Sequence, residues 1–299
     1  TFNPELPVGE YARIYIQTGA VRNQGLELAL NYNNTWKDFT WNTGVTYSMN
    51  KNKILTLADN AINPITHEKF SISSLNMGGL GSTRFILKEG GSMGDIYSLM
   101  DLKRDANGAV YIDENNSVVT ESLEANNYIK LGSVLPKGNL AWRNNFSWKN
   151  INVAFLVSAR LGGVVFSRTQ AVLDNFGVSE ASAAARDKGY VSVNGNDRVN
   201  PEGWYSVVAG GTAVPQYYIY SATNIRLQEA SIGYTIPRKW LGNVCDIKVS
   251  LIGRNLWMIY NKAPFDPESV ASTDNFYQGI DYFMMPSLRN IGFNLSFKF

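Results

Sequence analysis

Side chains able to perform covalent chemistry are scarce in this chain of 299 residues. It contains one histidine, His67, and one cysteine, Cys245. A serine–histidine–carboxylate arrangement would have to use His67, and the adjacent Thr66 and Glu68 give no support for one. A metal centre built from several histidine or cysteine ligands is excluded by the count, and one cysteine allows no internal disulfide. The sequence therefore predicts no catalytic residue, no cofactor and a protein that is not an enzyme.

An acidic loop partly fits a calcium-binding pattern through Asp105, Asn107, Gly108 and Glu114. When Gly108 takes the sixth place of such a loop, the first ligand position falls on Lys103, and a cation there repels calcium. We therefore predict a turn closed by aspartate and asparagine side chains, and no metal.

The remaining chemistry is recognition by aromatic rings in the longest connection, at 167–218. Rings on an exposed loop stack on sugar faces or hold peptide side chains, but they also pack a loop against its neighbours or against a lid protein. Both interpretations stay open. In the same connection, the alanine-rich stretch 178–188 predicts a short helix, with Ser179 near its cap and Gly189 as its stop. The candidate ligand-binding residues are Trp204, Tyr205, Tyr217 and Tyr218.

The composition narrows the class of protein. The net charge is +2, so the chain lacks the basic surface of a nucleic-acid binder. It has no run of about 18 apolar residues, which excludes a transmembrane helix. Residues 1–10 do not resemble a signal peptide, so we expect either a cytoplasmic protein or a segment from inside a longer chain.

The elements that position these groups alternate in polarity with the period of a β-strand. In the last strand, every second residue from Ile291 to Phe299 is apolar, and the residues between them are polar or small. These runs approach the nine to eleven residues, roughly, that a tilted strand needs to cross a bilayer. A soluble sandwich shows the same period, with shorter strands and the apolar face packed inside. The same alternation recurs over 24–36, 39–50, 138–148, 151–161 and 245–257.

Short and long connections alternate along the chain, as in outer-membrane barrels with short periplasmic turns and long extracellular loops. We count about nine strands, including 83–89 and 94–102, and an odd number does not close a bacterial barrel. The chain is thus expected to be the C-terminal part of a larger transmembrane antiparallel β-barrel. The short connections are 37–38, 90–93, 149–150 and 237–244, and the long ones are 53–82, 103–137, 163–222 and 261–287.

Charged residues on the polar side of these strands are expected to face a wet lumen or a polar plug. They are polar because that side does not meet lipid, and pairing with a plug is the favoured role for most of them. The predicted lumen-facing residues include Arg143, Arg160, Arg226 and Arg254, together with Glu27, Asp246 and Lys248.

Several short motifs are spread over nearly the whole chain. They are 20–28 (AVRNQGLEL), 39–54, 226–237 (RLQEASIGYTIP), 253–257 (GRNLW), 265–268 (FDPE) and 285–289 (MPSLR). Together, and in family order, these segments resemble the C-terminal barrel of SusC/RagA-type TonB-dependent transporters of Bacteroidota. One departure is the acidic loop, where only Asp105 to Gly108 remains of a longer family pattern.

This resemblance implies a barrel of about 22 strands closed by an N-terminal plug. It also implies import of oligosaccharides or oligopeptides, driven by TonB, with a SusD-like lipoprotein lid outside the cell. Residues 1–299 are then one barrel segment, with the plug, the TonB-binding region and the other strands outside it. Phe299 resembles the terminal signal for barrel assembly, and it is equally the last lipid-facing residue of its strand. A passive porin or a barrel enzyme is the alternative, although an enzyme needs a catalytic constellation that is lacking here.

Overall fold

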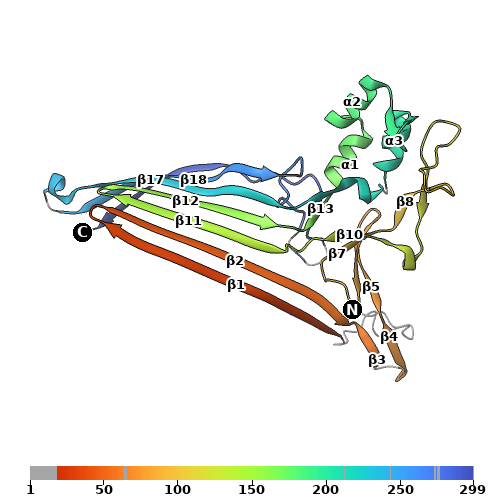
Figure 1. Cartoon of the computed structure of the whole chain (residues 1–299), viewed down its shortest axis with the longest axis horizontal. Helices are drawn as coiled ribbons and strands as arrows, with labels where there is room; N and C mark the ends of the chain where they lie inside the picture. Colours follow the sequence, from red (N-terminus) through yellow and green to blue (C-terminus); the bar gives the residue numbers. More distant parts are fainter. Residues whose placement is uncertain are drawn as a thin grey trace, which may run out of the picture.

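The computed structural model describes residues 19–63, 66–211, 213–242, 244–272, 274 and 277–298. They form two regions, a long flat sheet and an irregular body at one of its ends (Figure 1). We call the sheet the wall, and we call the body the cap (57–137, 162–223 and 262–289). None of the described helices is both long and apolar enough to cross a membrane. Phe299 lies outside the described residues.

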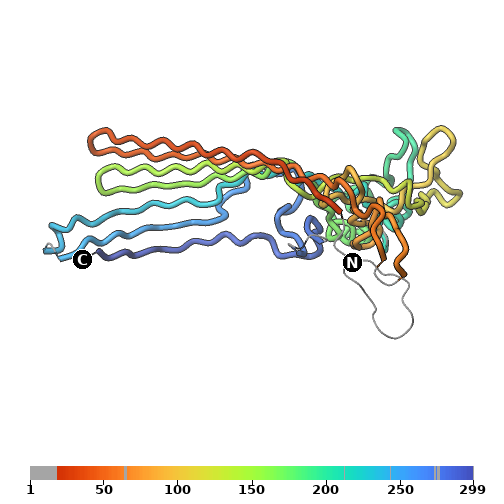
Figure 2. The backbone as a smooth tube through the Cα atoms, turned by 90° about the horizontal axis from the view of Figure 1, so that it is seen from below, coloured from red at the N-terminus to blue at the C-terminus, as the bar shows by residue number. Residues whose placement is uncertain are grey.

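The wall is one antiparallel sheet in which neighbours in space are also successive wall strands along the chain. Figure 2 shows the strands side by side, with the short turns at one end and the cap at the other. Most of these strands are far longer than the five or six residues, roughly, of an average strand. In sheet order they are β1 (Ala20–Trp36), β2 (Phe39–Thr56), β11 (Gly138–Trp148), β12 (Ile151–Leu161), β17 (Asn224–Ile236), β18 (Asp246–Asn261) and β20 (Asn290–Lys298).

Two predicted tight turns are confirmed. Residues 37–38 join β1 to β2, and residues 149–150 join β11 to β12. Lys37 and Lys149 both adopt positive φ angles, 52° and 51°, which let a two-residue connection reverse an antiparallel pair. The turn between β17 and β18 is longer and contains the short 3-10 helix η3 (Arg238–Leu241).

The strand register gathers the large apolar side chains on one face of the wall. Val45 lies opposite both Leu30 and Trp142, and Leu251 lies opposite both Ile232 and Phe293. These side chains remain open, with exposed fractions of 55% for Leu251 and 78% for Phe293. Among the described residues, no second sheet packs on this face. The apolar face is thus open within the described residues, unlike the inward apolar face that the soluble-sandwich alternative requires.

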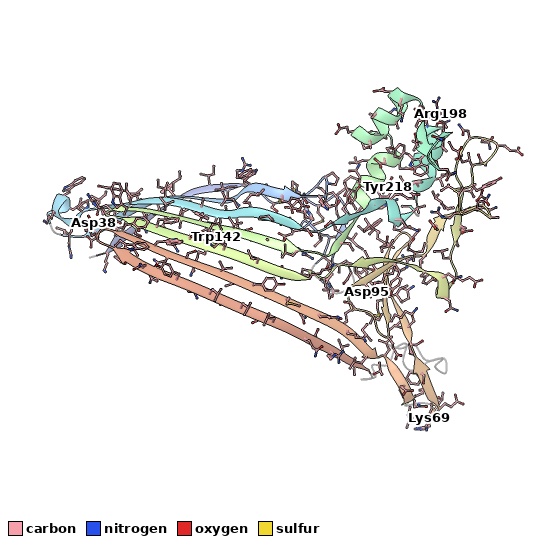
Figure 3. All side chains as sticks on the ribbon, viewed as in Figure 1. Asp38, Lys69, Asp95, Trp142, Arg198 and Tyr218 are labelled. Atoms are coloured by element: carbon pink, nitrogen blue, oxygen red, sulfur yellow. The ribbon has the colours of Figure 1, made fainter. Side chains whose placement is uncertain are left out.

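Polar groups within the apolar face are covered by indole rings. The Trp41 Nε1 donates a hydrogen bond of 3.1 Å to the Asn144 Oδ1, and the Trp142 Nε1 donates one of 3.1 Å to the Thr43 Oγ1. Trp142 is labelled in Figure 3 near the middle of the wall. Because unpaired polar groups are costly in an apolar medium, these hydrogen bonds stabilise the Asn144 Oδ1 and the Thr43 hydroxyl among the tryptophans. The buried Asn144 Nδ2 has no hydrogen-bond partner among the described residues.

Among the described residues, the wall has two strands fewer than the nine or so predicted. The segments predicted as strands 83–89 and 94–102 form β6 (Thr83–Lys88) and β7 (Asp95–Ser98), which belong to a separate sheet in the cap. β2 instead pairs directly with β11. Both Phe85 and the adjacent Ile86 are buried in β6, so this strand lacks the open apolar face that the wall strands have. Within the part of the chain that the structure describes, the wall has seven strands, and short and long connections still alternate between them.

The cap consists of small sheets and three short helices around a core of its own. The predicted helix is confirmed as α2, with Ser179 capping its N-terminus and Gly189 ending it at φ 82°. Its strands are β3 (Ala58–Ile62), β4 (Lys69–Ile72), β5 (Ser74–Leu80), β6, β7, β8 (Met100–Leu102), β9 (Thr120–Ser122), β10 (Ile129–Ser133), β13 (Val164–Ser167), β14 (Val191–Val193), β15 (Asp197–Val199), β16 (Ile219–Ser221) and β19 (Ile280–Asp281). Its helices are α1 (Arg168–Asn175), α2 (Glu180–Lys188) and α3 (Pro201–Val208), with 3-10 turns η1 (Ala125–Asn127) and η2 (Pro215–Tyr218).

The main cluster of buried hydrophobic residues lies entirely within the cap. It includes Phe85, Phe166, Val214 and Tyr218, all at most 3% exposed, and none of its members comes from the wall strands. The cap is thus held together by an ordinary hydrophobic core, whereas the wall is held by its hydrogen-bonded ladder and side-chain contacts between strands.

Candidate functional site

The four arginines predicted from the strand pattern share one face of the wall. Arg160 lies opposite Asn139 and Asn224, and Arg254 lies opposite Glu229. Arg143 and Arg226 occupy the same phase of their strands. This face is opposite to the one that carries Trp142 and Phe293, because side chains alternate along a strand. The structure therefore brings the four arginines to the polar side of the sheet.

A cavity of about 540 Å³ opens on this polar face. Its floor is formed by β1, β2, β11 and β12, and Glu268 of the cap lies at its side. The Arg160 Nη2 donates a hydrogen bond of 2.7 Å to the Val134 carbonyl, while its Nε is buried without a hydrogen-bond partner among the described residues. The polar side chains that line the cavity are Glu27, Thr46, Ser48, Asn139, Ser158, Arg160 and Glu268.

An ion-pair cluster centred on the buried Arg226 attaches the cap to the wall beside this cavity. The Arg226 Nη2 lies 3.0 Å from the Asp266 Oδ1 and 2.9 Å from the Glu268 Oε2. Arg226 is 5% exposed. The Ser287 hydroxyl donates to the same Asp266 carboxylate. Two of the segments that carry the family resemblance, 226–237 and 265–268, are thus partners in space, which the sequence pattern alone did not indicate.

The environment of Asp266 favours its charged form. Burial by itself would raise the pKa of this carboxyl. The hydrogen bonds from Ser287, from the Glu268 backbone and from Arg226, together with the Arg226 charge, outweigh burial and leave the pKa below its ordinary value. The Arg226–Asp266 contact is therefore a charged pair at neutral pH.

Two neighbouring bulges continue this junction. Gln228 of β17 and Asn255 of β18 both sit where the strand register shifts, and Asn255 has a φ of 51°. The Gln228 Nε2 donates to the Asn255 Oδ1 at 3.2 Å, and the Asn255 Nδ2 donates to the Leu288 carbonyl at 3.2 Å. The bulges thereby hold the chain that leads from the cap into β20.

Arg254 and Arg143 differ from Arg226 in burial. The Arg254 Nε lies 3.0 Å from the Glu229 Oε2, but the two side chains are 67% and 41% exposed. An exposed pair of this kind contributes little to stability. Arg143 is exposed on the same face.

The four predicted ligand-binding aromatics divide into three environments. Trp204 and Tyr217 contact each other edge to face, with 5.3 Å between ring centroids. Tyr218 is 3% exposed and donates a 3.0 Å hydrogen bond to Asp174, and Figure 3 places it at the base of the helical part of the cap. Tyr205 lines a second cavity, of about 510 Å³, between the helices. The structure thus pairs Trp204 with Tyr217, and it places Tyr205 and Tyr218 near the same carboxylate, Asp174.

The other residues considered for chemistry lie in turns. The Asp105 Oδ1 accepts hydrogen bonds from the backbone N–H groups of Asn107 and Ala109, which confirms the predicted turn. His67 is exposed with a φ of 57°, in a hairpin connection where its N–H donates to the Asn63 carbonyl.

Comparisons with known proteins place this fold. No family model matches the chain. TonB-dependent receptor P3 of Formosa agariphila is 25% identical over 333 residues, which cover 98% of this chain and 30% of the relative. TonB-dependent receptor P26 of the same organism is 28% identical over 304 residues, covering 94% of this chain and 29% of the relative. The chain thus spans about a third of the length of these curated relatives.

Solved structures give the same result at the level of the fold. The RagAB peptide transporter matches 94% of this chain with a TM-score of 0.65 at 16% identity, and the match covers 30% of that structure's chain. The RagAB peptide importer in its open-open state matches with a TM-score of 0.64. The predicted resemblance and the predicted fold class, part of an antiparallel β-barrel, are confirmed. These relatives are named receptors and transporters, not enzymes, in agreement with the prediction for this chain.

Proposed function

We propose that this chain is a C-terminal barrel segment of a TonB-dependent transporter that imports an oligosaccharide or an oligopeptide across a bacterial outer membrane. The observation that carries the proposal is the match of 94% or more of the chain to two proteins named TonB-dependent receptor. The RagAB structures, named as a peptide transporter, support the peptide alternative.

The two faces of the wall give the physical basis. Transfer of exposed side chains such as Leu251 and Phe293 from water to lipid is favourable, so the apolar face belongs against the hydrocarbon of a bilayer. The opposite face carries Arg143, Arg160 and Arg254, which belong in a water-filled or plug-filled lumen. In this arrangement the wall separates lipid from a transport path.

The two outer strands of the wall need further hydrogen-bond partners in the complete transporter. β1 and β20 each have one neighbour among the described strands, so their outer backbone groups need partners within a membrane. We assign those partners to other strands of the same barrel, with the plug inside it. The TonB complex acts through the plug, and a SusD-like lipoprotein covers the cap from outside.

The residue roles follow from this placement. The lumen-facing residues are Arg143, Arg160, Arg226 and Arg254. Arg226 also attaches the cap to the wall. The aromatic residues that contact a ligand or the lid are Trp204, Tyr205 and Tyr217. Tyr218 packs behind them in the core of the cap. The protein resides in the outer membrane of a Gram-negative bacterium, and the two Formosa agariphila relatives favour Bacteroidota.

Uptake of labelled substrates by cells that carry the full-length transporter tests the proposal. Cells are offered labelled oligopeptides and oligosaccharides, with and without a functional TonB, and the lipoprotein that co-purifies in detergent is identified. We expect uptake of one substrate class that is lost without TonB. Uptake that persists without TonB favours the passive porin and contradicts the proposal, as does the absence of uptake of either class.

A further inference from the structure

The second cavity lies in the cap, between α1, α2 and α3, away from the polar face of the wall. Figure 1 shows the three helices gathered on one side of the cap. The end of α1 and the two residues after it (Asp174 to Gly177), the end of α2 and the start of α3 line a space of about 510 Å³. This volume lies within the usual size range of ligand pockets.

One wall of this cavity holds a buried carboxylate without a cationic partner. Asp174 is 6% exposed, and its oxygens accept hydrogen bonds from the Tyr218 hydroxyl at 3.0 Å and the Gln170 amide at 3.2 Å. Among the residues that the structure describes, no ion pair involves Asp174. A buried anion held only by neutral donors keeps a large part of its desolvation penalty, which a cation brought to the same cavity would offset.

The surrounding groups strengthen the preference for a cation. The C-terminal ends of α1 and α2 lie at the cavity and carry partial negative charge, whereas the N-terminus of α3, which also lies there, carries partial positive charge. The Arg186 guanidinium already donates to the Gly177 carbonyl at the end of α1, so these carbonyls do accept cationic donors. Glu202 lies at the rim, which leaves one negative charge in excess over Arg186.

Aromatic rings complete the site. Phe176 is 73% exposed at the cavity, and Tyr205 lines the same space. Tyr205 and Asp174 line the same cavity, and burial and the Asp174 charge both raise the pKa of Tyr205. A large ring left open beside a carboxylate suits a ligand with an apolar stem and a cationic end, because rings attract cations and bury methylene groups.

From these contacts we propose that the cavity between α1, α2 and α3 binds an amine or guanidinium group of an oligopeptide, with Asp174 as its counter-charge. Tyr205 and Phe176 contact the stem of the bound side chain. Tyr218 acts as a positioning residue, since it holds the Asp174 carboxylate from the core and does not reach the ligand. This inference rests on the proposed function and narrows its substrate to peptides with basic groups.

The test uses the full-length transporter in detergent and two peptides that differ in one charge. The probes are the acetylated and amidated tetrapeptide Ala-Lys-Phe-Ala and the same peptide with norleucine in place of lysine. Isothermal titration is expected to give a Kd at least about tenfold lower for the lysine peptide, with a difference that shrinks as salt is raised. Equal affinities, or no binding of either peptide, would overturn the proposal.

Variants then locate the binding. Asp174→Asn is expected to abolish the difference between the two peptides, and Glu180→Gln, an exposed acid of α2 outside the cavity lining, is expected to preserve it. A difference that survives in D174N places the binding elsewhere and overturns the assignment. If limited proteolysis shows that D174N has lost its folded cap, Phe176→Ala decides instead. It should weaken binding of the lysine peptide at least about threefold, and an unchanged Kd overturns the proposal.

The outcome is distinguishable from the fate of the transport proposal. TonB-dependent uptake of a glycan or a neutral peptide, with no charge preference in the titration, leaves the transporter intact and removes this site. If the charge preference is lost in D174N but uptake does not depend on TonB, the cation site is supported and the transport proposal fails.

Discussion

Phe166 in the cap and Phe293 in the wall show how differently the two regions use one residue type. The ring of Phe166 is 1% exposed within a cluster of other apolar side chains, whereas the ring of Phe293 is 78% exposed on a continuous apolar face. The cap folds as proteins in water do, with apolar groups inside. The wall has the opposite arrangement, which is stable only where the surrounding medium is itself apolar.

This comparison also separates two sources of stability. Nearly every backbone group in the middle of the wall pairs with a neighbouring strand, so the sheet satisfies its polar groups without an interior. The small sheets of the cap have two to four strands each and depend on one another for burial. Mutations are therefore expected to act through packing in the cap and through the lipid–water difference in the wall.

The largest expected effect is the loss of packing in the cap. Phe166→Ala should destabilise the cap by about 3–5 kcal/mol, because it removes a fully buried ring and leaves a cavity. Limited proteolysis should then cleave within 57–137 or 162–223 while the wall stays assembled. Phe176→Ala, at an exposed ring, is the matched control and should change stability by less than about 0.5 kcal/mol. Equal protection of the two variants would contradict a separate cap core.

The second-largest effect is expected from a charge on the apolar face of the wall, and it tests whether lipid surrounds that face. Leu251→Arg should cost about 2–4 kcal/mol when the full-length barrel folds into lipid bilayers, because a charge on the lipid face is desolvated. Ser250→Arg, the adjacent position on the polar face, is the control and should be tolerated. Denaturant titration in vesicles measures both. A water-soluble protein would accept arginine at the half-exposed Leu251 with little change, and that result would exclude the membrane assignment.

A smaller effect is expected at the junction of the two regions. Asp266→Asn should ease the opening of segment 262–289 by about 1–3 kcal/mol, because Arg226 loses one of its two charged acceptors and keeps only Glu268. Hydrogen exchange of that segment measures the change, and Glu121→Gln, at an exposed acid of β9, is the control. Unchanged exchange in D266N would show that the ion pair does not hold the cap.

The pKa of Asp266 predicts how the same junction responds to acid. Its folded-state pKa lies below the ordinary value of 3.8, so its contribution to stability is complete above that value. The contribution is lost as the pH falls through the folded-state pKa. Exchange of segment 262–289 should therefore accelerate below about pH 3.8 in the native protein and not in D266N.

The local features of the fold were predictable because they depend on residues close along the chain. The two-residue turns follow from strand runs that end at Trp36 and Trp148, and the α2 helix follows from Ser179, an alanine-rich stretch and Gly189. The sorting of Arg143 and Arg160 away from Trp142 and Phe155 follows from the two-residue period alone. None of these features requires knowledge of what a strand pairs with.

Features that depend on pairing were decided only by the tertiary structure. Segments 83–88 and 95–98 do form strands, as their sequence pattern predicted. They belong to the cap, however, because β2 pairs directly with β11 and leaves no place for them in the wall, and their side chains are buried in the cap. The contacts of Arg226 with Asp266 and of Tyr218 with Asp174 join residues 40 or more positions apart. Alternation along a strand determines on which face of the sheet a side chain lies. Which residue contacts that side chain depends instead on how the long connections fold back onto the sheet. The sequence therefore determined a two-faced wall, and the tertiary structure determined the junction, the buried carboxylate and the cavity beside it.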